Sequence, residues 1–278
     1  MLWNGRIFVN ISSEGMTMRG NTVFPQIYYP LAKLRGILSI PHSGETIPQD
    51  FDQFLVSDRR ALDEDVDYHV HQLIDREQLQ AQGVAIIITP IHRVCLDLNR
   101  PREMAVLNWD KNTQGISLLK APATQEQHEI WLKAYYDPYY QKIKELIEEL
   151  KKSRVGDRPP FIDLHSMPSK PTAYHLKANP RQGASRPDFC ISDLKGLSCT
   201  PEFMQKILEF IQQEGHDARQ NDPYFGGQVT KYVQTFGINN VQIEIKRSLY
   251  MDENKKVLLP AAPELKKKLS AALQKIFS

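Results

Sequence analysis

From Gly36 onward, short apolar runs alternate along the chain with segments that show helical periodicity. The apolar runs have the length of buried strands and are bounded by turn-forming or polar residues. This alternation predicts an α/β fold of three layers, αβα, in which helices cover both faces of a central, mostly parallel mixed sheet. We expect the strands at residues 37–41, 84–90, 160–164, 187–192 and 240–246.

Helical periodicity marks four segments between and after these strands. In the first of them, five apolar residues approximate one stripe: Val66, Val70, Leu73, Ile74 and Leu79. Within the second, Pro138 should end or kink the helix, because proline lacks the backbone N–H that the helical ladder needs. The expected helices are 65–82, about 124–153, 201–214 and 263–277, and the proline-rich segment 166–187 is expected to be a loop that covers a site.

The first 35 residues do not follow the alternating pattern. Residues 6–11 and 23–28 are predicted to be edge strands, since Pro25 argues against a central position. A chain of 278 residues suits one large α/β domain or two small ones. We therefore predict an N-terminal extension over residues 1–35 and a single domain over residues 36–278.

Composition excludes two classes of partner. The formal net charge is only +2, with no long block of like charge, so a basic face for nucleic acid is not expected. No apolar stretch could cross a bilayer, so no membrane partner is expected. The three cysteines show no CxxC spacing and are interpreted as small buried residues of a reducing compartment. We expect a cytoplasmic protein, and the sequence makes no prediction of oligomeric state.

A histidine ends each of two predicted strands. His42 and His165 each follow an apolar run and each precede a serine. Ligands of open α/β sheets gather at the carboxyl ends of strands. Either histidine alone is interpreted as a hydrogen-bonded core residue, but the repeated arrangement favours a metal site. Catalytic zinc typically has three histidine or carboxylate ligands and one position for water.

Two acidic residues are candidates for the third ligand. Glu45 lies three residues after His42, a spacing that can close on one metal. Asp67 lies near the start of the predicted helix 65–82, where the helix dipole favours a carboxylate. The alternative for Asp67 is ordinary helix N-terminal charge, which also suits its neighbours Asp63, Glu64 and Asp65. His69 and His71 are expected to face solvent or core.

Two arginines follow the predicted strand 84–90. Arginine suits carboxylate recognition, because its planar guanidinium can bond both oxygens. Arg93 and Arg100 could divide two tasks, one holding a substrate carboxylate and the other stabilising an oxyanion. The alternative is a structural ion pair between Asp97 and one of them, and the two interpretations are compatible.

Glu244 lies inside an apolar run and, by strand alternation, shares a face with Gln242. Burying a glutamate is costly unless it is paired or used. As a general base, Glu244 could take a proton from metal-bound water and deliver it to a leaving amine. The alternative is an edge strand with Glu244 in water. Upstream of Glu244, Gly226 and Gly227 indicate a turn that opens a helix and lets the backbone approach a ligand. No GxSxG motif supports a serine hydrolase.

Taken together, these segments resemble the N-formylglutamate amidohydrolase (deformylase) family. The ordered motifs span residues 36–255 and comprise SIPHSG at 39–44, Asp67, Arg93, DLNR at 97–100, DLHS at 163–166, Gly226 and Gly227, QIE at 242–244 and YM at 250–251. That family is similar in fold to zinc carboxypeptidases and to the aspartoacylase group. The resemblance implies zinc, or another divalent metal, as the cofactor.

The resemblance also implies a role for each motif residue. It makes His42, Asp67 and His165 the metal ligands, with Glu45 as the alternative acidic ligand. It makes Glu244 the catalytic base and Arg93 the oxyanion stabiliser. Asn99 and Arg100 would hold the substrate carboxylate, and Gly227 would be a further substrate-binding residue.

The reaction implied is hydrolysis of a small N-acyl amino acid, N-formyl-L-glutamate, to formate and L-glutamate, as in histidine catabolism. Two alternatives use the same fold: a metallo-carboxypeptidase or peptidoglycan-type amidase, and a binding protein without catalysis. A small closed cavity favours the formyl substrate, whereas an open groove favours a peptide.

Overall fold

A seven-stranded sheet forms the centre of the molecule. The computed structural model describes residues 2–3, 6–7, 24–153, 156–180 and 182–278. The strand order is β3-β5-β4-β6-β9-β7-β8. Pairing is antiparallel between β3 and β5 and between β7 and β9, and parallel elsewhere. The strands are β3 Gln26–Tyr28, β4 Gly36–Ile40, β5 Val84–Ile88, β6 Pro160–Met167, β7 Phe189–Ser192, β8 Ala218–Gln220 and β9 Asn239–Lys246.

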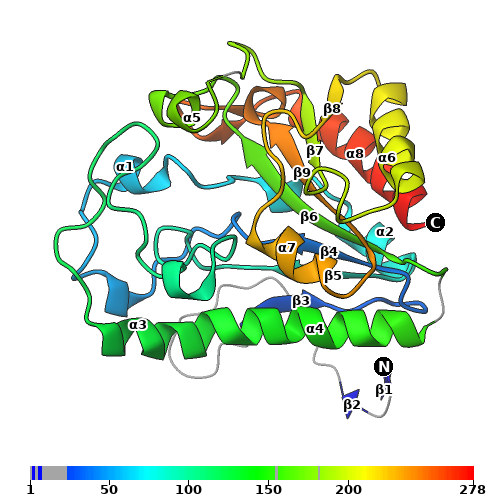
Figure 1. Cartoon of the computed structure of the whole chain (residues 1–278), viewed down its shortest axis with the longest axis horizontal. Helices are drawn as coiled ribbons and strands as arrows, with labels where there is room; N and C mark the ends of the chain where they lie inside the picture. The colour runs from blue at the N-terminus through cyan, green and yellow to red at the C-terminus, as the bar shows by residue number, and fades with distance from the viewer. Residues whose placement is uncertain (1, 4–5, 8–23, 154–155, 181) are drawn as a thin grey trace.

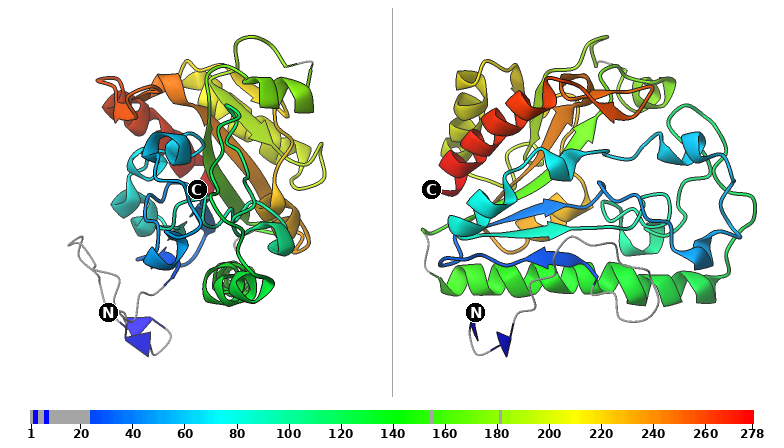
Figure 2. Two further views of the ribbon diagram at one scale, coloured as in Figure 1. Left: turned by 90° about the vertical axis from the view of Figure 1, so that its left-hand side faces the viewer. Right: turned by 180° about the vertical axis from the view of Figure 1, so that it is seen from behind.

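Helices cover both faces of this sheet, as Figures 1 and 2 show. The α-helices are α1 Arg59–Asp63, α2 Arg76–Ala81, α3 Gln125–Trp131, α4 Asp137–Lys152, α5 Ala173–Ala178, α6 Pro201–Gln213, α7 Gln228–Gln234 and α8 Ala262–Phe277. Helices α2, α6 and α8 pack on one face, and α3, α4 and α7 pack on the other. The predicted mostly parallel mixed sheet with helices around it is therefore confirmed.

Short elements complete the chain. They are the 3₁₀ turns η1 Gln49–Phe51, η2 Val70–Gln72, η3 Arg102–Met104 and η5 Arg247–Leu249, the π segment η4 Leu132–Tyr136, and two ribbons, β1 Leu2–Trp3 with β2 Arg6–Ile7 and β10 Met251–Asp252 with β11 Val257–Leu258. No helix in the described part of the chain is long and apolar enough to cross a membrane. All three cysteines are free and buried, as predicted.

The predicted helix 65–82 is wrong. Only its last part is an α-helix, because the Asp75 side chain accepts a hydrogen bond from Gln78 N and caps the start of α2. Upstream, His69 has a φ of 63°, which breaks the helical path before the single 3₁₀ turn η2. The five apolar residues of the predicted stripe are nevertheless buried, so the pattern located core residues without locating a helix.

The prediction that Pro138 ends or kinks the helix is wrong. The chain widens into the π segment Leu132–Tyr136 directly before α4, in whose first turn Pro138 lies. This local change of helical hydrogen bonding accommodates a residue that has no backbone N–H. The two α-helices and the π segment between them continue as one rod along the sheet (Figure 1).

Two other predictions are confirmed in part. Residues 26–28 form an edge strand, β3, which pairs with β5 and joins the main sheet. Of the predicted strand 6–11, Arg6–Ile7 pairs with β1, and the remainder lies outside the described residues. The predicted loop 166–187 is shorter than expected, because β6 continues to Met167 and α5 occupies Ala173–Ala178.

Candidate active site and metal centre

Strand register builds the site. Side chains of β6 and β9 alternate between the two sheet faces, and Asp163, His165, Gln242 and Glu244 occupy the face toward α4 and α7. Asp163 lies opposite Gln242, and His165 lies opposite Glu244. The parallel pairing of β6 with β9 therefore places His165 and Glu244, which are far apart in the sequence, side by side on adjacent strands.

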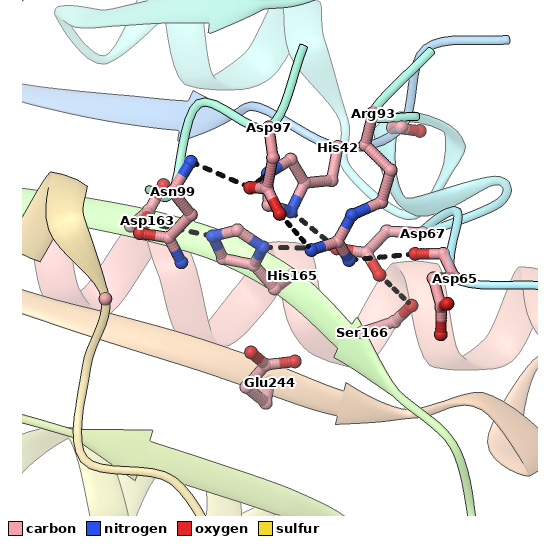
Figure 3. A network of polar contacts seen from close by, with 12 residues as sticks. His42, Asp65, Asp67, Arg93, Asp97, Asn99, Asp163, His165, Ser166 and Glu244 are labelled. Carbon is pink, nitrogen blue, oxygen red and sulfur yellow. Dashed lines mark hydrogen bonds and ion pairs between the residues drawn. The ribbon is translucent and has the colours of Figure 1, made fainter. Parts of the chain in front are cut away.

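His42, Asp67 and His165 come together beside this face. One ligand atom from each lies within 4.8 Å of the others, and all three side chains are buried. His165 Nδ1 is 3.1 Å from Asp67 Oδ2, and His42 Nδ1 is 3.8 Å from the same oxygen. Asp67 reaches this position because its backbone N–H donates to the carbonyl of His42 at 3.0 Å. Figure 3 shows the three side chains converging.

Polar contacts hold the opposite sides of these three groups. His42 Nε2 lies 2.9 Å from Asp97 Oδ1, and His165 Nε2 lies 2.9 Å from Asp163 Oδ2. The remaining oxygen of Asp67, Oδ1, accepts two hydrogen bonds, one from Ser166 Oγ and one from Arg247 Nη2, each at 3.2 Å. These contacts leave both histidine Nδ1 atoms and Asp67 Oδ2 facing one another.

This donor set fits a divalent metal. His42 Nδ1 is buried and has no hydrogen-bond partner among the described residues. Two imidazole nitrogens and one carboxylate oxygen form a ligand set typical of catalytic zinc. The carboxylates behind the two rings are the partners that commonly orient metal-binding histidines.

Burial and charge shift several pKa values in the site. Burial raises the pKa of Glu244 to about 7, outweighing the opposite effect of His165. Burial also opposes ionisation of Asp67, but the hydrogen bond and charge of His165, together with Arg247, hold the Asp67 pKa below its usual value. Desolvation alone would lower the pKa of His165, but Asp163 and Asp67 raise it well above normal. The site thus stabilises a negatively charged Asp67 and a positively charged His165 in direct contact.

The structure separates the two acidic candidates. Glu45 is exposed and lies outside the group of three, whereas Asp67 belongs to it. The predicted reason for Asp67 is wrong, because it lies in a loop between α1 and η2, so neither the helix dipole nor helix N-terminal charge applies. Its neighbour Asp63 pairs with Arg59, and Asp65 accepts bonds from Thr113.

Glu244 lies in an interior strand, so the edge-strand alternative is wrong. Strand β9 is flanked by β6 and β7, and Glu244 is 8% exposed. Its Oε1 accepts a bond of 2.7 Å from Gln242 Nε2. The buried carboxylate therefore has a single direct amide partner among the described side chains, on its own strand.

The two arginines differ in their surroundings. Arg93 donates to Asp97 Oδ2 at 3.0 Å and to the Asp65 carbonyl at 2.8 Å, so the predicted structural ion pair is present. Arg100 is more exposed, lies 3.7 Å from Asp97, and its guanidinium carbon is 5.2 Å from the centroid of the Trp109 ring. Arg93 is fixed by its partners, whereas Arg100 keeps donors at the surface.

Asn99 and Gly227 are in direct contact where α7 begins. Asn99 Oδ1 accepts from Val229 N at 3.1 Å, and a Cβ on Gly227 would lie 2.1 Å from that oxygen. Gly226 has a φ of 109°, so the predicted glycine turn opening a helix is confirmed. Gln242 Oε1 links Asn99 and Gly227, because it accepts hydrogen bonds from Asn99 Nδ2 and from Gly227 N.

Sequence reasoning assigned no role to three residues that complete this network. Asp163 lies two residues before His165, and Gln242 lies two residues before Glu244, so each shares a strand face with a predicted site residue. This two-residue spacing was the signal in the sequence that could have identified them. Arg247 carries no such signal, because its partner Asp67 is 180 residues away. His69 and His71 bond to the Lys256 carbonyl and to Ser43 Oγ, outside the group of three.

Comparison with known proteins places the chain in a family. A model of the N-formylglutamate amidohydrolase family matches residues 34–251. The crystal structure of N-formylglutamate amidohydrolase from Ralstonia eutropha JMP134 is similar, with a TM-score of 0.77 and 22% identity over 91% of this chain and 96% of that one. The gene product Atu2144 from Agrobacterium tumefaciens has a TM-score of 0.62 and 19% identity over the same shares.

At these identities, the two structures show a shared fold. A comparison with curated protein sequences found no match. The family match covers most of the chain and includes all the residues of the buried polar network. The chain is therefore a hydrolase that belongs to the N-formylglutamate amidohydrolase family.

Proposed function

We propose that the protein is a zinc-dependent amidohydrolase that converts N-formyl-L-glutamate to formate and L-glutamate. The observation that carries this proposal is the convergence of His42 Nδ1, His165 Nδ1 and Asp67 Oδ2 beside the sheet face that holds Glu244. The three residues would hold the metal. When bound, zinc acts as a Lewis acid and lowers the pKa of a water molecule. A cytoplasmic role in histidine catabolism follows from the proposed substrate.

Glu244 is the proposed general base. Its position opposite His165 places the carboxylate next to the ligand group, and its pKa near 7 suits a residue that must take up and release a proton near neutral pH. Glu244 takes a proton from the attacking water and delivers it to the leaving amine. Gln242 Nε2 fixes one carboxylate oxygen during this exchange.

Arg93 and the DLNR segment are proposed to handle substrate charge. Arg93, held by Asp97, directs a fixed positive charge at the developing oxyanion. Arg100 binds the α-carboxylate with its free donors. Asn99 retains one amide N–H beyond its bond to Gln242, and Gly227 lets the backbone approach the ligand.

The cavity beside Arg100 supports a small substrate. It has a volume of about 590 Å³ and is lined by Arg100, Trp109 and Tyr174 among others. Tyr174 belongs to α5, within the segment predicted to cover the site. This volume lies in the range of small-molecule pockets and can hold an N-acyl amino acid.

Metal analysis combined with formate release tests the proposal. The purified protein is expected to hold one zinc per chain and to release formate from N-formyl-L-glutamate faster than acetate or succinate from the matching N-acetyl and N-succinyl compounds. Glu244→Gln should keep the zinc and lose turnover. Failure to bind zinc stoichiometrically, or hydrolysis unaffected by Glu244→Gln, would refute the mechanism.

A further inference from the structure

Arg186 is a buried arginine without an acidic partner. It lies directly before β7 and is 3% exposed. No ion pair involves it among the described residues. The other arginines near the site are paired, Arg247 with Asp67 and Arg93 with Asp97. A buried charge without a counter-ion is costly, so the isolation of Arg186 needs an explanation.

Hydrogen bonds account for only part of the guanidinium. One terminal nitrogen donates to the Pro168 carbonyl at 3.1 Å, and the other donates to Gln182 Oε1 at 3.0 Å. Both acceptors are neutral. The Nε atom is buried and has no partner among the described residues. A guanidinium has five N–H donors, so donors remain for a further acceptor, and the missing charge indicates an anion.

Tyr224 links Arg186 to the strand that lies beside the proposed base. Its guanidinium carbon is 5.1 Å from the centroid of the Tyr224 ring. The Tyr224 carbonyl accepts a bond of 2.9 Å from Ser192 Oγ on β7. In the β7–β9 register, Ser192 lies opposite Gln242, and the neighbouring residue on that face lies opposite Glu244. Tyr224 therefore connects Arg186 to the polar face of the sheet, one strand from the base.

Helix α5 connects Arg186 with the cavity at Arg100. The Tyr174 ring lies 6.0 Å from the Trp109 ring, over which Arg100 is placed. The next residue, His175, has its ring 6.4 Å from that of Tyr224. Burial, followed by the charge of Arg186, lowers the pKa of His175 to about 4. Tyr174 and His175, which are consecutive in α5, thus lie beside the two rings that the arginines contact, Trp109 for Arg100 and Tyr224 for Arg186. With this pKa, His175 is neutral at neutral pH and adds no positive charge beside Arg186.

We propose that Arg186 is the residue that binds the side-chain carboxylate of the substrate and so discriminates it from an uncharged analogue. This inference rests on the proposed function. Arg100 takes the α-carboxylate, and Arg186 takes the carboxylate of the side chain. The bound anion supplies the counter-charge that the described residues do not provide, and the bonds from Arg186 to Pro168 and Gln182 hold these two residues beside the guanidinium.

Paired substrates test this assignment. N-formyl-L-glutamine is nearly isosteric with N-formyl-L-glutamate but lacks the side-chain charge. The wild type is expected to prefer the glutamate compound by about a hundredfold in kcat/KM, the scale of one charged bidentate pair. Arg186→Gln should remove this preference, mainly through KM, and change kcat/KM for the glutamine compound less than about threefold. Arg186→Lys should restore part of the preference.

Arg158→Gln is the matched control, because Arg158 also has an unpartnered Nε and donates to a backbone carbonyl, but lies near the amino end of β6. It should leave the preference unchanged. Equal losses on both substrates in Arg186→Gln would mean that Arg186 only supports the fold, and a wild type without preference would also overturn the assignment.

Binding separates this inference from the proposed function. If zinc-loaded wild type releases no formate from either compound, the proposed function fails. Calorimetric titration with glutarate and with its monoamide then tests Arg186 alone. Tighter binding of glutarate that is lost in Arg186→Gln supports the assignment, and equal binding of the two compounds overturns it.

Discussion

Strands β6 and β9 carry two different surfaces on their opposite faces. Toward α2, α6 and α8 they present an apolar core of Ile162, Leu164, Val241, Ile243 and Ile245. Toward α4 and α7 the same strands present Asp163, His165, Gln242 and Glu244, all buried. The apolar face provides the stability that allows the polar face to keep charges close together. Substitutions on each face should therefore have separable effects.

The largest effect is expected on the polar face, from His165→Ala. Removing one of the two imidazoles leaves a ligand set that no longer suits catalytic zinc, so metal should be lost and formate release should fall below detection. Inductively coupled plasma mass spectrometry and a formate assay measure the two effects. A variant that retains one zinc per chain would contradict the proposed role of His165.

Glu244→Gln should lower kcat by about 10²–10⁴-fold, the usual contribution of a general base. Zinc content should stay at the wild-type value, because Glu244 is not among the three converging groups. Single-turnover formate release from the zinc-loaded variant measures the loss. If zinc is lost as well, Glu244 contributes to metal binding and not to proton transfer alone.

On the apolar face, Ile243→Ala should cost about 2–5 kcal/mol in the free energy of unfolding, because it leaves a cavity in a fully buried core. KM for N-formyl-L-glutamate should remain unchanged in the folded protein. Denaturant titration and steady-state kinetics provide the two readouts, with Ile243→Val as a milder control. A large rise in KM would show that the two faces are not separable.

Arg100→Ala should raise KM by about 30-fold to 150-fold, since a hydrogen bond to a charged group contributes about 2–3 kcal/mol. Its kcat should change little, because Arg100 lies at the cavity and not among the buried ligands. Initial rates over a range of substrate concentrations separate the two constants. An unchanged KM would remove Arg100 from carboxylate binding.

The smallest effect concerns pH and the metal-free protein. Burial raises the pKa of Glu244 from 4.5 in the unfolded chain to about 7 in the fold, so the folded state binds the proton more tightly. Its contribution to stability is therefore complete below pH 4.5 and is lost as the pH rises through 7. Metal-free wild type should lose stability relative to metal-free Glu244→Gln across that interval, and parallel denaturant curves would contradict the shift.

The strands were predictable because long apolar runs have few other places to lie. The five predicted strands correspond to β4, β5, β6, β7 and β9, and period-two alternation placed Glu244 and Gln242 on one face. His42 follows β4 as predicted, whereas the prediction that His165 follows its strand is wrong, because β6 continues to Met167 and His165 lies inside it. The strand positions and the shared face were predictable because they depend on local sequence and on burial.

Residues held by long-range contacts were not predictable from local patterns. Asp67 was selected through the family resemblance, while the local argument for it, a helix dipole, is wrong because Asp75 starts the helix later. Arg247 and Arg186 gave no signal, since their positions depend on the sheet order, in which the antiparallel strand β7 lies beside β9. Strand order is a property of the whole fold.

The backbone bond from Asp67 N to the carbonyl of His42 has a consequence for comparing sequences. It fixes the acidic group relative to the histidine in space, although 24 residues separate the two in the chain. Insertions or deletions in the turns of the intervening segment, which also contains η1 and α1, can be accommodated without moving the carboxylate. Motif searches that require an acid three positions after the histidine would therefore select the exposed Glu45 in this chain, whereas searches that leave the interval open would also find Asp67.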